Sequence, residues 1–111
     1  MNIENLKKLR THLTSGKYLH GTGQLEKMVD GIKHHCCIGV AGQEYQEEYD
    51  PSNLDVDTYR WFQKWLNINK DEMVEFYDTN DGNLLGTDGK SYDKVVKLID
   101  KHIKQEEKAN V

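Results

Sequence analysis

The fold of this chain is decided by residues 13–40, LTSGKYLHGTGQLEKMVDGIKHHCCIGV. Glycines, basic groups, imidazoles and both cysteines of the protein fall together in this stretch. Such a composition fits a binding or catalytic site, and it equally fits a glycine-rich turn followed by two buried thiols. The rest of the sequence is typical of an ordinary helical scaffold, so the question of function depends mostly on these residues.

The N-terminal half is expected to hold two helices separated by an extended or irregular segment. Apolar residues recur at helical spacing over residues 3–14, and Gly16 stands where a left-handed residue would end that helix. Residues 17–33 have no helical period, which favours one or two short strands or a long ordered loop. Residues 36–46 are predicted to be a helix, and the two glycines within it indicate close packing against another element.

Caps and turns divide the C-terminal half. Asp57 is predicted to cap a helix with an aromatic face, and Asn69 followed by Glu72 has the spacing of a capping box that opens the next helix. Ser91 is predicted to cap the last helix. Breaks or turns are predicted at residues 50–53, 78–83 and 87–90.

These patterns predict an α+β fold of four or five short helices, with a small antiparallel sheet or hairpin from the N-terminal glycine-rich region. Residues 1–111 are expected to form a single domain, and the charged tail over 105–111 is expected to fray. No apolar run approaches the ~20 residues that span a bilayer, and the N-terminus has no apolar signal region. We therefore expect a cytosolic protein in which the two adjacent cysteines are reduced.

The charge of the chain is distributed unevenly. Its formal net charge is −4, but residues 1–35 carry six Lys and Arg against three Asp and Glu, a net of +3. Residues 36–59 carry six acids and no Lys or Arg. Overall acidity argues against general nucleic-acid binding, whereas the basic N-terminal third is suited to attract a small anion.

The glycine turn Gly21-Thr22-Gly23 is the favoured binding site. Backbone N–H groups in such a turn can cradle phosphate oxygens, and neighbouring cations add charge-assisted hydrogen bonds. ATP hydrolysis is not predicted, because the complete phosphate-binding loop motif is missing. The residues predicted to bind the anion are Lys17, Tyr18, His20, Gly21, Thr22, Gly23 and Gln24, with His34 and His35 as helpers.

The paired cysteines, Cys36 and Cys37, allow three interpretations. A thiol nucleophile activated by a helix N-terminus and a nearby imidazole is one, but the sequence identifies no residue that would orient the imidazole. A zinc site with His34 and His35 is disfavoured, because four consecutive residues do not converge easily on one tetrahedral ion. Burial of both thiols in the core is favoured. No metal or cofactor is predicted.

Several of these motifs together resemble a family of small uncharacterised bacteriophage proteins. That family reads roughly Leu-x-Ser-Gly-Lys-Tyr, then Gln-Gly-x-Gly-x-Leu, then Cys-Cys-Leu-Gly-Val, and the counterparts here are residues 13–25 and 36–40. An Asn-Asp turn at 80–81 and a closing helix at 91–103 complete the resemblance. His20 departs from the family's frequent glutamine, and Gly42 stands near the place of a further cysteine. The family has no assigned biochemistry, so the resemblance implies a phage origin.

The resemblance of this chain to small phage accessory proteins suggests that it has a counter-defence role. The leading hypothesis is a non-enzymatic binding protein in the host cytosol that sequesters an anionic nucleotide signal of bacterial immunity, with a homo-oligomer expected by analogy. One alternative is a protein inhibitor that docks on a host defence enzyme through the acidic stretch from Glu44 to Asp57. The other alternative is a small cysteine-dependent enzyme.

Overall fold

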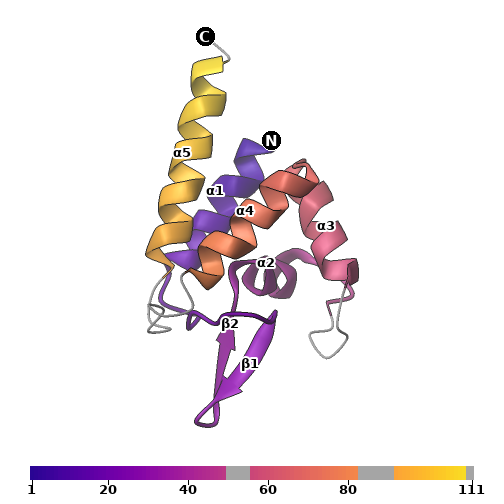
Figure 1. Ribbon diagram of the computed structural model, residues 1–111, viewed down its shortest axis with the longest axis vertical. Coiled ribbons are helices and arrows are strands. Elements are labelled where there is room, and N and C mark those ends of the chain that lie inside the picture. Colours follow the sequence, from indigo (N-terminus) through magenta and orange to yellow (C-terminus); the bar gives the residue numbers. More distant parts are fainter. Residues whose placement is uncertain (50–55, 83–91, 110–111) are drawn as a thin grey trace.

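The computed structural model describes residues 1–49, 56–82 and 92–109. In this part the chain is α+β, as predicted, with five helices and one two-stranded antiparallel hairpin. The element order is α1 (Ile3–Leu13), β1 (Glu26–Val29), β2 (Ile32–His35), α2 (Cys37–Tyr45), α3 (Val56–Leu66), α4 (Lys70–Asp81) and α5 (Asp93–Ala109). The helices pack into one body, and the hairpin projects from it on the side away from the C-terminal end of α5 (Figure 1).

Helix α1 forms as the periodicity predicts. The side chain of Asn2 caps it by accepting a 3.0 Å hydrogen bond from the backbone N–H of Asn5. Its apolar stripe, Leu6, Leu9 and Leu13, is buried against the other helices. Thr14 is the C-terminal cap, and Gly16 two residues later has a φ of +79°, a conformation that glycine adopts without a steric penalty.

The hairpin turns at Asp30 and Gly31. Both residues have positive φ, +52° and +78°, which matches the twist of a two-residue hairpin turn. The strands pair in register from Glu26 opposite His35 to Val29 opposite Ile32. Strands were therefore correctly expected near residues 17–33, although β2 extends to His35. The Asp-Gly pair was the local signal for this turn; the glycine turn at 21–23 lies before the hairpin instead.

Helix α2 lies at the centre of the body, where it contacts α1, α3, α4 and β2. Its cap is Cys36, whose Sγ accepts a 3.3 Å hydrogen bond from the N–H of Gly39. A Cβ on Gly39 would overlap with the carbonyl oxygen of Leu25 and approach its carbonyl carbon to 2.9 Å. A Cβ on Gly42 would lie 2.6 Å from the ring of Tyr49. The expected close packing at these glycines is confirmed.

The C-terminal helices match the prediction in part. The capping box at Asn69 and Glu72 is present, with reciprocal hydrogen bonds of 2.8 and 3.0 Å. Helix α3 begins at Val56, so Asp57 lies in its first turn and is not its cap. The predicted turns at 50–53 and 87–90 and the predicted cap Ser91 lie outside the described residues.

The predicted break at residues 78–83 is wrong for most of its length. Helix α4 continues through Asp81 and ends at Gly82, which has a φ of +61°. The polar run is helical because Asn80 is fully buried and its side chain finds hydrogen-bond partners in other elements. Helix α5 also continues to Ala109, five residues past Lys104, and Glu106 on it contacts the N-terminal amino group at 3.4 Å.

The described helices include none that is both long and apolar enough to cross a membrane.

Replacing Gly39 with alanine tests the packing of α2. Helix propensity alone predicts stabilisation by about 1 kcal/mol. The contact with the Leu25 backbone predicts the opposite, a loss of about 2 kcal/mol or more in the free energy of unfolding, measured by urea denaturation. Gln43→Ala is the control, because Gln43 is exposed on the same helix, and its effect should stay within about 0.5 kcal/mol. A stabilised Gly39→Ala protein would contradict the close approach.

Candidate functional site

The segment that contains the predicted site is held by the side chain of Asn80 on α4. Its Oδ1 accepts a 2.9 Å hydrogen bond from the N–H of Cys37, at the start of α2. Its Nδ2 donates to the carbonyl oxygen of Gly21 at 2.9 Å. The imidazole of His20 lies 2.7 Å from the backbone oxygen of Asn80, and both side chains are buried. His20 and Gly21 are therefore part of the framework that joins the loop to α2 and α4.

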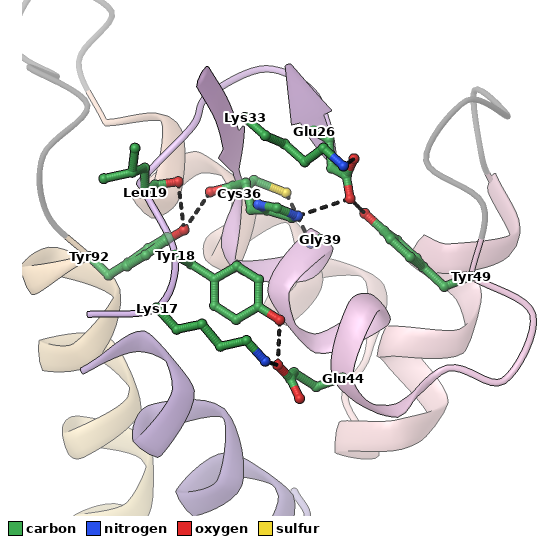
Figure 2. Close-up of polar contacts among 11 residues, drawn as sticks. Lys17, Tyr18, Leu19, Glu26, Lys33, Cys36, Gly39, Glu44, Tyr49 and Tyr92 are labelled. Atoms are coloured by element: carbon green, nitrogen blue, oxygen red, sulfur yellow. Dashed lines mark hydrogen bonds and ion pairs between the residues drawn. The ribbon is translucent and has the colours of Figure 1, made fainter. Parts of the chain in front are cut away.

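The same segment is joined to the base of the hairpin. His20 forms a parallel bridge with His35, in which the N–H of Gly21 donates to His35 and the N–H of His35 donates to Leu19. The hydroxyl of Tyr92, at the start of α5, lies 3.0 Å from the carbonyl oxygen of Leu19 and 2.7 Å from that of His35 (Figure 2). The loop and the hairpin base are thus fixed to the helical body.

The predicted cation Lys17 is paired within the protein. Its Nζ lies 2.6 Å from Oε1 of Glu44 on α2, and the hydroxyl of Tyr18 donates to the same oxygen (Figure 2). The hydrogen bond from Lys17, followed by that from Tyr18, lowers the pKa of the Glu44 carboxyl. The positive charge expected to attract an anion at Lys17 is therefore largely offset by Glu44.

The two helper histidines are also engaged. His34 Nδ1 lies 3.1 Å from the carbonyl oxygen of His20. His35 Nε2 lies 2.9 Å from Oε1 of Glu26, which also accepts a 3.0 Å hydrogen bond from Tyr49 (Figure 2). Burial lowers the pKa of His35, so the neutral ring donates through Nε2 and leaves its buried Nδ1 without a partner in the described chain. His35 is therefore buried and paired with Glu26.

The backbone of the glycine turn already holds an anionic group. The N–H of Gly23 donates a 3.0 Å hydrogen bond to Oδ1 of Asp81 at the end of α4. Next to it, Lys27 Nζ donates to the hydroxyl of Thr22 at 3.1 Å. Lys27 has no carboxylate partner among the described residues, in contrast to Lys17 and Lys33, which pair with Glu44 and Glu26. Lys27, which was not among the predicted site residues, is the cation best placed at this turn.

A cleft of about 420 Å³ opens beside Gly23 and Gln24. Helix α4 contributes one side of it with three residues spaced four apart, so that they share a helix face. Helix α3 contributes a tyrosine, and Cys36, the cap of α2, is also a lining residue. Its lining is Gly23, Gln24, Cys36, Tyr59, Met73, Tyr77 and Asp81. Of the nine predicted residues, Gly23 and Gln24 line the cleft, while Lys17, Tyr18, His20 and His35 make contacts within the protein that join the loop, the hairpin and the helices.

Sequence reasoning missed the wall of this cleft. Met73, Tyr77 and Asp81 share a helix face, and this spacing was the available signal. It was overlooked because the polar run before Gly82 indicated a break in the helix. The contribution of Tyr59 has no comparable local signal, because it depends on how α3 packs against α4.

Both cysteines are buried, as the favoured interpretation predicted. Cys36 is 4% exposed and Cys37 is fully buried. Burial raises the pKa of Cys36 to about 12 and that of Cys37 well above its usual value. Both groups are therefore protonated thiols at neutral pH, whereas a nucleophile requires the thiolate. Among the described residues, no three His, Cys, Asp or Glu side chains are grouped to hold a metal ion.

Comparisons with known proteins found no matching family model, no similar curated protein and no similar solved structure.

Thiol accessibility distinguishes a structural from a catalytic role for the cysteines. We expect no modification of Cys36 or Cys37 by iodoacetamide at pH 7.5 in the native protein and modification of both in urea, because the folded thiols are buried and protonated. Intact-mass spectrometry measures the number of labels. Rapid single labelling of the native protein would restore the thiol-enzyme hypothesis.

Proposed function

We propose that this chain is a non-enzymatic binding protein that docks on another protein through its hairpin. The proposal rests on one observation, the exposed apolar tip of the hairpin: Met28 is 63% exposed, Ile32 53% and Val29 40%. A projecting apolar tip of this kind is a recognised mark of an interaction site. Val29 and Ile32 are a cross-strand pair next to the turn, so they lie together on one face.

The hairpin is also suited to binding because its base is anchored. Glu26 holds His35 and Tyr49, and Tyr92 contacts the backbone of β2 at His35. An element that is ordered before binding loses less conformational entropy when it enters a groove on a partner. The backbone of β1 has a strand on only one side, since the sheet of the described residues contains β1 and β2 alone. Its outer edge has no strand partner among the described residues, and a partner strand could pair with it.

The biological setting of the proposal comes from the resemblance to the phage family. It favours a phage-encoded protein with a counter-defence role, a host defence enzyme as the partner, and action in the host cytosol. The acidic stretch from Glu44 to Asp57 was the docking surface expected from the sequence. It offers less free negative charge than expected, because Glu44 is paired with Lys17 and Tyr18. Glu47 and Glu48 are exposed and remain a charged surface for comparison with the hairpin.

Affinity capture from host lysate, followed by titration of the captured protein, tests hairpin docking. Val29→Ser with Ile32→Ser should weaken binding by at least about 100-fold, because these two side chains share one face of the hairpin and each buried apolar side chain contributes about 1.5–3 kcal/mol. Leu19→Ser is the matched control, since Leu19 is an exposed apolar residue outside the hairpin. Binding that survives the tip variant but is lost in Glu47→Lys with Glu48→Lys would contradict the hairpin and favour the acidic surface. Sedimentation of the same variants reports whether the hairpin also mediates the expected homo-oligomer.

Sequestration of an anionic nucleotide is the second candidate function. One observation favours it: Lys27 contacts Thr22 beside the cleft and has no carboxylate partner in the described chain. A phosphate there would gain a charge-assisted hydrogen bond. It would also lie near the Asp81 carboxylate on Gly23, which opposes a second anion.

Calorimetric titration with cyclic and linear nucleotides tests this second function. If it holds, Lys27→Ala weakens nucleotide binding about tenfold, the loss expected for one hydrogen bond to a charged group. Lys97→Ala is the control, because Lys97 is an exposed lysine on α5. Absence of binding to every nucleotide by the folded protein would remove the sequestration hypothesis.

A further inference from the structure

The cleft beside Gly23 is lined by both aromatic and polar residues. Tyr59 and Tyr77 are its aromatic residues, with ring centres 6.4 Å apart and planes inclined at 73°. Burial raises the pKa of Tyr59 to about 12, so its ring carries no charge at neutral pH. Met73 adds a flexible apolar side chain of the kind that adapts to aromatic surfaces. This part of the cleft is suited to a planar ring, which binds more tightly when it stacks on an aromatic side chain.

The polar lining residues of the cleft offer hydrogen-bond acceptors. Oδ1 of Asp81 is occupied by the N–H of Gly23 at 3.0 Å and by Nδ2 of Asn80 at 3.1 Å. These contacts orient the carboxylate, and its Oδ2 has no partner among the described residues. The amide side chain of Gln24 is exposed and likewise has none there. Asp81 and Gln24 both line the cleft, and Gly23, the neighbour of Gln24, is hydrogen-bonded to Asp81, so the two residues offer oxygen acceptors to a ligand there.

The charge of the cleft disfavours a phosphate inside it. Asp81 is the one charged residue among the lining residues of the described chain. It would repel a phosphate while attracting N–H donors. The fitting ligand is therefore an uncharged planar heterocycle that presents adjacent N–H donors along one edge. Among the nucleobases this is guanine, whose ring N–H and 2-amino group are neighbours; adenine and cytosine place their amino group beside an acceptor.

We propose that this cleft binds a guanine base, delivered as an unphosphorylated nucleoside. The ring lies against Tyr59 and Tyr77, and the N–H edge donates to Oδ2 of Asp81 and the amide oxygen of Gln24. This site is independent of hairpin docking, because none of its lining residues belongs to β1 or β2. It also differs from the anion site at Lys27, because it requires no phosphate.

Titration of ¹⁵N-labelled protein with guanosine, followed by NMR, tests the proposal. We expect saturable shifts of the amide signals of Gly23 and Asp81. Inosine, which lacks only the 2-amino group, should bind about tenfold more weakly, because it leaves an acceptor unpaired. Adenosine should bind more weakly still. Guanosine monophosphate should bind no more tightly than guanosine. Agmatine, which has the N–H edge without the ring, should bind at least about tenfold more weakly than guanosine.

Variants separate specific binding from a loss of folding. Asp81→Asn keeps an oxygen for the N–H of Gly23 and should weaken guanosine binding about tenfold by removing the charged acceptor. Asp78→Asn is the matched control, an exposed aspartate on the same helix, and should leave binding unchanged. Gln24→Leu changes an exposed side chain and should weaken guanosine binding without affecting the fold.

Four results would overturn the proposal. They are no shift of the Gly23 signal with guanosine, equal affinities for guanosine and inosine, agmatine binding as tightly as guanosine, and monophosphate binding more than tenfold tighter than nucleoside. The last result would favour the anion site at Lys27.

Discussion

The arrangement of this protein depends on the buried side chain of Asn80. Helix α2 begins with backbone N–H groups that lack partners within the helix, and Asn80 Oδ1 satisfies that of Cys37. The amide nitrogen of the same side chain holds Gly21, which is otherwise in a loop. A buried polar group left unpaired costs about 1–3 kcal/mol. Because one side chain satisfies groups in two separate segments, the position of α4 sets the positions of α2 and of the glycine turn.

The arrangement of the cleft depends on the hydrogen bonds made by Asn80. Asp81 comes directly after Asn80, and its Oδ1 receives hydrogen bonds from Asn80 and from Gly23. The carboxylate is therefore oriented by the framework that holds the turn. Met73 and Tyr77 lie on the preceding turns of α4 and extend the wall from this carboxylate. The glycine turn was expected to bind an external anion, and in the structure its Gly23 N–H binds an anionic group of the protein itself.

The hairpin and the cleft differ in how their apolar residues are arranged. The tip of the hairpin exposes Met28, Val29 and Ile32, which suits a macromolecular partner with a complementary groove. The cleft places its aromatic residues along an open volume of about 420 Å³, which suits a small ring. Both are supported by the segment from Leu19 to Gly21, which contacts β2 on one side and α4 on the other.

The sequence by itself determined the features that depend on neighbouring residues. The stripe of α1, the capping box of Asn69 and Glu72 and the close packing of the α2 glycines were predictable, because periodicity, caps and missing side chains act within a few residues. Only the tertiary structure decided which charges are available and where α4 ends. Lys17 meets Glu44 across 27 positions, and Gly23 meets Asp81 across 58. Such pairs have no local pattern, because the folding of distant segments, rather than local preference, supplies their partners.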